Sequence, residues 1–437
     1  MFRFIRIPID DLVAVLRSFW RGAAARRVAK LGTAVVLGRV FTALGYILVA
    51  RLYAPADFGL FAIYLAAAVV LTALAGASYD RAIVAETSQR SALGALLLAL
   101  LLSAGLAVLL LLVFAIFDDV LLAARQLEDV PWMLWALPLG MFLKAGYRTV
   151  EQWAVRRGTF NMQGYAHVSA AITQMALQVS LAFAPIAGPY ALLLADIGAG
   201  LVALGVIAVP QASSVLAVYR AHKHDLRLRY IAVRWMPTYA LPSGMLALLV
   251  QSSPVLLLAP LFSAAIVGQV AMAVRILELP YQLIISVFSN VGYHRIASAP
   301  LAERTITFRR AARQLLVLAV AVYGTVAVSA PIVIPLLLGP QWTSAVLFLV
   351  ELVPFYIGLF VTGPLLVFYV IARRENRLLM TRLCLLGSVP IAWAVQQFTG
   401  DIHLMLISFS ASATLACIAV FFDMYVLAKL WQRLAEE

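Results

Sequence analysis

Five long runs without a charged residue constrain this 437-residue chain more than any other feature. They are residues 58–79, 91–117, 158–195, 235–274 and 314–350. A bilayer core about 30 Å thick is crossed by about 20 helical residues, so the first two runs predict one membrane-spanning helix each. With 64% hydrophobic and 12% charged residues, the chain cannot cover itself with polar side chains. This excludes a soluble enzyme and a nucleic-acid-binding protein.

The other three runs are too long for one span, at 38, 40 and 37 residues. Each has a turn signal near its middle, at Pro185 to Pro189, Ala259 to Ser263, and Gly339-Pro340. Each therefore predicts a helical hairpin. Further apolar segments bring the expected total to twelve spans, and they are 31–52, 131–152, 189–210, 265–291, 344–371, 378–397 and 402–426.

Basic residues predict the orientation of these spans, because Lys and Arg are retained on the cytoplasmic side. The N-terminal segment, the tail and alternate loops hold 26 of the 33 Lys and Arg residues, whereas the opposite loops hold one, Arg125. We therefore expect both termini in the cytoplasm. The expected units are a basic interfacial segment at 1–30, an N-lobe at 31–210, a cytoplasmic loop at 211–236, a C-lobe at 237–426 and a cytoplasmic tail at 427–437.

The chain also matches itself at an offset of 209 residues, where 52–62 aligns with 261–271. Identical residues fall at 52/261, 56/265, 59/268 and 62/271. Both segments are expected to form the outside turn between the first two helices of a six-helix half. The match predicts a duplicated six-plus-six transporter with parallel repeats.

Two motifs carry a resemblance to a known family. The run from Gly38 to Gly59 (GRVFTALGYILVARLYAPADFG) and its continuation from Gly76 to Val84 (GASYDRAIV) resemble the opening signature of bacterial polysaccharide transporters. These are lipid-linked oligosaccharide flippases of the multidrug/oligosaccharidyl-lipid/polysaccharide exporter superfamily. The turn from Leu338 to Trp342 (LGPQW) is similar to their turn between helices nine and ten. The resemblance implies an all-α membrane protein of about 12 transmembrane helices. Its two six-helix lobes enclose a central cavity, lined by helices 1, 2, 7 and 8, that opens alternately to each side.

The resemblance also implies a function. A polyprenyl-diphosphate-linked oligosaccharide, with undecaprenyl as the expected carrier, would move to the outer leaflet of the bacterial inner membrane for O-antigen, lipopolysaccharide or exopolysaccharide assembly. No catalytic residue, metal or cofactor is expected, apart from a coupling H⁺ or Na⁺. The expected partners of this monomer are the substrate, membrane lipids, a polysaccharide polymerase and a chain-length regulator, and no nucleic acid.

Three alternatives remain open at this point. The chain could be a multidrug exporter or a peptidoglycan-precursor exporter of the same superfamily. It could also be a polyprenyl-dependent membrane glycosyltransferase or polymerase, which would need acidic catalytic residues in a sizeable outside loop. The outside loop with most acidic residues, at 118–130, is only about a dozen residues long, which disfavours an enzyme.

Six basic residues fall inside predicted helices, where a charge at the membrane centre costs about 2.5–3.5 kcal/mol. Arg39 and Arg275 lie near the expected midplane and are candidates for binding a diphosphate or an acidic sugar, which suits the arginine fork. For Arg275 the alternative is an ion pair with Glu278, one turn away. Arg51 and Arg382 lie near helix ends and are expected to extend to the membrane surface.

Four further residues are candidates for the cavity. Lys144 and Arg148, one turn apart, predict either a substrate rail or a network between helices. Gln251 and Ser252 precede Pro254 in a proline-rich helix, and interrupted helices mark binding sites in transporters.

Three carboxylates inside the spans, Glu278, Asp196 and Glu351, are candidates for a coupling or a structural role. We expect Asp196 and Glu351 to be lone buried acids. His167 and His403 are expected to be satisfied histidines of the core or of a helix interface.

Overall fold

The computed structural model describes residues 45–122, 131–159, 161–184, 188–222, 241–298, 304–372 and 374–436. Within these ranges every regular element is a helix, and a helical segment at 45–52 precedes the first labelled one. The first group is α3 (Pro55–Ala75), α4 (Tyr79–Ala85), α5 (Gln89–Leu122), α6 (Pro131–Arg156), α7 (Asn161–Ala182) and α8 (Pro189–His222). The second is α9 (Leu241–Leu258), α10 (Ala264–Ser298), α11 (Arg304–Leu338), the 3₁₀ turn η3 (Pro340–Trp342), α12 (Thr343–Leu365), α13 (Val367–Ile371), α14 (Glu375–Leu386), α15 (Ser388–Thr399) and α16 (Ile402–Glu436).

Nine spans among the described residues are long and apolar enough to cross a membrane. Helices α6 and α7 are not among them because polar residues interrupt their sequences, but they have 26 and 22 residues and pack along α8. These eleven spans correspond to eleven of the twelve predicted ones. The twelfth, at 31–52, lies mostly outside the described residues, as does the segment at 1–30. The expected all-α, multi-pass membrane fold is confirmed.

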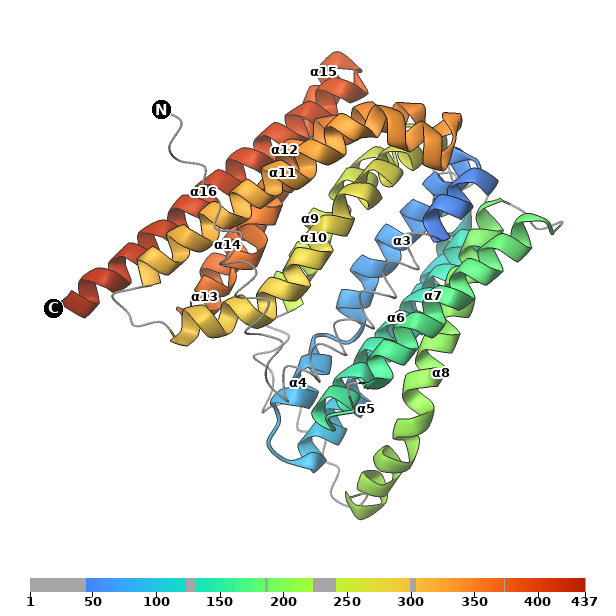
Figure 1. Ribbon diagram of the computed structural model, residues 1–437. Coiled ribbons are helices and arrows are strands. Elements are labelled where there is room, and N and C mark those ends of the chain that lie inside the picture. Colours follow the sequence, from blue (N-terminus) through green and yellow to red (C-terminus); the bar gives the residue numbers. More distant parts are fainter. Residues whose placement is uncertain are drawn as a thin grey trace.

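The helices form two groups that meet at one end and diverge toward the other (Figure 1). Helices α3 to α8 pack on one another, as do α9 to α16, and the main contacts between the groups are those of α3 with α10 and α9. We call the groups the N-lobe and the C-lobe. The turns that lead into α3 and α10 lie together with η3 where the lobes meet.

Helices α3 and α10 cross at the meeting end with their backbones in direct contact. A Cβ atom on Gly59 would lie 1.8 Å from the carbonyl oxygen of Ala264, and one on Gly268 would lie 1.8 Å from that of Pro55. Only glycine permits this approach, as small residues do between membrane helices generally. Gly59 and Gly268 are the pair that the internal sequence match aligns, so the two halves make reciprocal contacts.

The two family-like motifs also meet at this end. The indole Nε1 of Trp342 donates a hydrogen bond to the Ala50 carbonyl at 2.8 Å, and the Gln341 side chain donates to the same oxygen at 2.6 Å. The Trp342 ring packs edge-on against Phe58, with centroids 5.2 Å apart. We call these contacts, together with the crossing of Gly59 and Gly268, the lobe junction.

Arg51 belongs to the same end, and its exposed side chain contacts the end of a helix of the other lobe. Its guanidinium donates to the carbonyls of Leu336 and Leu337, the latter at 2.8 Å. These carbonyls lie in the last turn of α11, where helical carbonyls have no partner within the helix and a cation is favourable. Arg51 therefore joins the N-lobe to the C-terminal end of α11.

Helix α9 is not interrupted at Pro254, contrary to the sequence-based expectation. A proline lacks the N–H that would bond to the carbonyl four residues earlier, here that of Val250. The Ser253 hydroxyl donates to this carbonyl at 2.8 Å. The helix continues to Leu258 because a neighbouring side chain replaces the missing backbone bond.

Candidate functional site at the lobe interface

Arg275, in the first half of α10, extends from the C-lobe to Tyr46 of the N-lobe. Its Nη1 donates a hydrogen bond to the Tyr46 hydroxyl at 2.6 Å, and its guanidinium carbon lies 4.8 Å from the centre of the Tyr46 ring. Tyr46 also lies within electrostatic range of Glu278 and Asp196. The hydroxyl and the ring face of Tyr46 both interact favourably with a cation. Arg275 of the C-lobe is therefore stabilised by a residue of the N-lobe.

The ion pair with Glu278, which the sequence left open as the alternative role of Arg275, is not present. The two charges are within electrostatic range, but no ion pair within 4.0 Å joins them. Instead, Glu278 accepts a hydrogen bond from the Gln251 side-chain amide of α9 at 2.9 Å. Arg275 is thus a partly buried cation without a carboxylate partner among the described residues. Ser252, next to Gln251, is partly buried in α9.

Lys144 and Asp196 form an ion pair inside the N-lobe. The Lys144 ammonium lies 2.7 and 2.8 Å from the two Asp196 oxygens, and joins α6 to α8. The Tyr64 hydroxyl of α3 donates to the same carboxylate at 3.3 Å. Gly140 leaves room for this tyrosine, since a Cβ there would lie 1.8 Å from the Tyr64 oxygen. Asp196 is therefore not the lone acid expected from the sequence.

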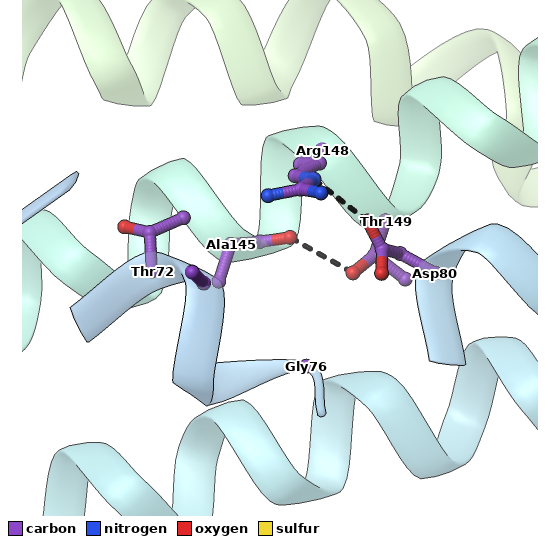
Figure 2. Close-up of a pocket in the computed structure, with 7 residues that line it drawn as sticks. Thr72, Gly76, Asp80, Ala145, Arg148 and Thr149 are labelled. Atoms are coloured by element: carbon purple, nitrogen blue, oxygen red, sulfur yellow. Dashed lines mark hydrogen bonds and ion pairs between the residues drawn. The ribbon is translucent and has the colours of Figure 1, made fainter. Parts of the chain in front are cut away.

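Arg148 and Asp80 form a second N-lobe pair (Figure 2). The Arg148 Nε lies 2.7 Å from an Asp80 oxygen and joins α6 to α4. Beside the pair is a pocket lined by Thr72 and Thr149, with room for about one water molecule. The Thr149 hydroxyl bonds to the Ala145 carbonyl of its own helix.

Tyr147 and Glu151 of α6 form a third polar cluster, which reaches His167 of α7. The Tyr147 hydroxyl donates to Glu151 at 3.3 Å and lies 3.3 Å from the His167 ring of α7. Together with the ion pairs of Lys144 and Arg148, this contact links α6 to three neighbouring helices, α4, α7 and α8. A network between helices was one of the two roles that the sequence predicted for Lys144 and Arg148. Substrate contact by either residue stays a prediction.

In the C-lobe, Glu351 is also paired, contrary to expectation. Its carboxylate lies 2.6 Å from the His403 Nδ1, and the His403 ring stacks on Phe348 with centroids 5.3 Å apart. Arg382 does not extend to the surface as expected. Its Nε is buried and has no hydrogen-bond partner in the described part of the chain.

Sequence reasoning missed Tyr46 and the pairing of Asp80. Tyr46 follows Arg39 by seven residues, two helical turns on the same face, which could have drawn attention to it. Asp80 is separated from Arg148 by more than sixty residues, so no local pattern joins them. Arg39 lies outside the described residues, and its role stays a prediction.

Comparisons with known proteins agree with this architecture. The family model described as "Polysaccharide biosynthesis protein" matches residues 48–347. Among solved structures, a lipid II flippase in an inward closed conformation has a TM-score of 0.68 and 12% identity, over 92% of this chain and 91% of that chain. An inward-facing multidrug resistance transporter of the MATE family has a TM-score of 0.64 and 15% identity, over 91% and 96%. A search of curated protein sequences returned no significant match.

The outward-facing form of a MATE family transporter matches with the same TM-score of 0.64, at 16% identity, over 95% of this chain and 98% of that chain. These structures share the fold of the MOP exporter superfamily, and they are transporters or flippases rather than enzymes. The family match covers more than half of the chain and includes the residues of the lobe junction, from Ala50 to Trp342. The chain therefore belongs to the polysaccharide biosynthesis protein family, and it is a multi-pass membrane protein with the fold of the MOP superfamily transporters.

Proposed function

We propose that this chain translocates a polyprenyl-diphosphate-linked oligosaccharide across the bacterial inner membrane for surface polysaccharide assembly. The substrate enters from the cytoplasmic leaflet and leaves to the outer leaflet as the lobes open alternately to each side. Both termini lie in the cytoplasm in this proposal, following the asymmetry of Lys and Arg. The family description and the fold support transport of a polysaccharide intermediate, and the charges at the lobe interface support an anionic head group.

The observation that carries the proposal is Arg275. It is an intramembrane cation that contacts both lobes and has no carboxylate partner in the described residues. An arginine at this depth must be solvated by water, protein or an anion, because lipid is too costly. A diphosphate offers oxygens that fit the guanidinium fork. Arg39 would be a second cation of the same site.

Glu278 is our candidate for coupling transport to an H⁺ or Na⁺ gradient. Glu278 lies one turn from Arg275. It accepts a hydrogen bond from the neutral side-chain amide of Gln251. Asp196 and Glu351 have partners in Lys144 and His403, which favours structural roles for both. We expect Glu278→Gln to remove the gradient dependence of transport.

A peptidoglycan-precursor flippase is the second candidate, because the fold resembles a lipid II flippase with a TM-score of 0.68. Its substrate would also carry a diphosphate, so Arg275 would serve equally. A multidrug exporter is less favoured, because two of the three candidate acids, Asp196 and Glu351, are paired with basic residues rather than free for a cationic drug.

The experiment compares Arg275→Lys and Arg275→Gln in a flippase-deficient strain, with membrane abundance measured in parallel. The lysine variant keeps the charge but loses the fork, so we expect partial surface glycan. The glutamine variant should lose most of it. Arg157→Gln is the matched control, since Arg157 is an exposed arginine of the N-lobe. Normal surface glycan from Arg275→Gln at normal abundance would contradict the proposal.

A further inference from the structure

We propose that Arg81 and Arg148 form an anion site at the lobe interface that receives the diphosphate of the lipid-linked substrate. The inference rests on the proposed function, and it assigns a role to Arg81, a residue that the proposed function does not use. It also places Arg148 in a defined site shared by two helices. The site is separate from the contact between Arg275 and Tyr46.

The backbone between α3 and α4 sets the two neighbours Asp80 and Arg81 in different surroundings. Ala77 and Ser78 have φ values of 46° and 61°, a left-handed conformation that is unfavourable for a residue other than glycine. Helix α4 starts directly after this turn, and successive residues of a helix point in different directions. As a result Asp80 is buried at 4% exposure, whereas Arg81 is exposed.

Arg148 holds Asp80 with only part of its guanidinium. Its Nε makes the 2.7 Å contact, and a third of the side chain remains exposed. Arginine has five N–H donors, and the terminal nitrogens of Arg148 make no hydrogen bond within the described residues. The pocket beside the pair has room for about one water molecule. A diphosphate would therefore bind on the exposed side of the guanidinium.

Arg81 lies close enough to Arg148 for each charge to act on the other. It makes no hydrogen bond or ion pair in the described part of the chain. Across the lobe interface, its Nη2 lies 3.4 Å from the position that a Cβ of Gly244 would occupy. Arg81 thus reaches α9 of the C-lobe, and the glycine leaves space at its guanidinium.

The charges of this cluster favour an anion. Asp80 pairs with Arg148 and Glu151 accepts a hydrogen bond from Tyr147, whereas Arg81 has no carboxylate within ion-pair distance among the described residues. Two like charges at short distance repel each other, and an anion between them relieves the repulsion. A diphosphate has enough oxygens to meet both forks, and arginine is well suited to bind phosphate in this way. The same oxygens occur in phospholipid head groups, so the test must separate the two sources.

The test measures equilibrium binding of farnesyl diphosphate to the purified full-length chain in a neutral detergent, with farnesol as the uncharged control. Arg81→Gln should weaken binding about tenfold or more, the effect of losing a charged hydrogen bond. Arg148→Gln would leave Asp80 buried without its partner, so the second variant is the double substitution D80N/R148Q, with the same expected loss. Arg157→Gln should bind like the wild type.

Unchanged binding by Arg81→Gln and by D80N/R148Q would overturn the inference. If Arg275→Gln nevertheless abolished binding, the proposed function would stand without this site. Wild-type binding of farnesyl diphosphate no stronger than that of farnesol would overturn both. In a second arm, phosphatidylglycerol should compete weakly; competition as strong as that of unlabelled farnesyl diphosphate would identify a phospholipid site instead.

Discussion

At the residue scale, the charges within the spans divide into those with partners and those without. Lys144 and Asp196 are the clearest pair, because both Asp196 oxygens lie within 2.8 Å of the ammonium and the carboxylate is only 9% exposed. Removing one member of a buried pair costs about 3–5 kcal/mol, because the other charge is left uncompensated. Asp196→Asn should therefore lower the unfolding temperature and the membrane abundance, and K144Q/D196N should recover part of both. Scanning fluorimetry of the purified variants measures this, and a single variant as stable as the wild type would refute the structural role.

Single residues also show where sequence reasoning stops. The charge-free runs predicted which acids and bases lie in the membrane, but not their partners. Glu278 and Arg275 are one turn apart, yet Tyr46 and Gln251 from other helices compete for their polar atoms. Asp196 has a partner 52 residues away in sequence. Sequence spacing shows which residues are neighbours on the same helix. The ion-pair or hydrogen-bond partner of a charged residue, however, depends on how the helices pack against one another.

At the scale of elements, the lobe junction is the contact that the proposed alternating access would have to break. Gly268→Ala would put a Cβ 1.8 Å from the Pro55 carbonyl, and a backbone atom cannot turn aside as a side chain can. We expect α3 and α10 to separate at this end. Phe58→Cys, in a background without Cys384 and Cys417, should then react faster with an impermeant thiol reagent. Gly324→Ala in α11 is the control, because nothing lies within 4 Å of the added methyl. Equal labelling rates in the two alanine variants would show that the crossing does not hold the lobes together.

The sequence match at an offset of 209 residues predicted that these two turns are equivalent, and the turns do occupy the same place in each lobe. It did not predict that they touch, because a repeat defines equivalent positions and not the axis that relates them. The division of the span at 58–79 was also not predicted. Two non-glycine residues adopt left-handed conformations there, and neither Ala77 nor Ser78 is typical of such a turn.

At the scale of the whole molecule, the structure resembles inward- and outward-facing transporters equally, with TM-scores of 0.64 for both. Its orientation is tested by labelling. The 26-to-1 asymmetry of basic residues predicts that a cysteine at Ser213 faces the cytoplasm and one at Ala123 faces outward. In intact cells an impermeant reagent should label only the cysteine at 123, and both should react after permeabilisation. Labelling of the cysteine at 213 in intact cells would reverse the topology.

The most direct test of the central claim asks which leaflet holds the lipid-linked glycan. Right-side-out inner-membrane vesicles from the host are treated with an impermeant lectin that binds the glycan, and the captured lipid-linked fraction is measured. With the wild-type chain we expect most of the glycan to be captured. Without the chain, or with Arg275→Gln at normal abundance, the glycan should stay in the inner leaflet and escape the lectin. Equal capture with and without the chain would contradict its role as the flippase.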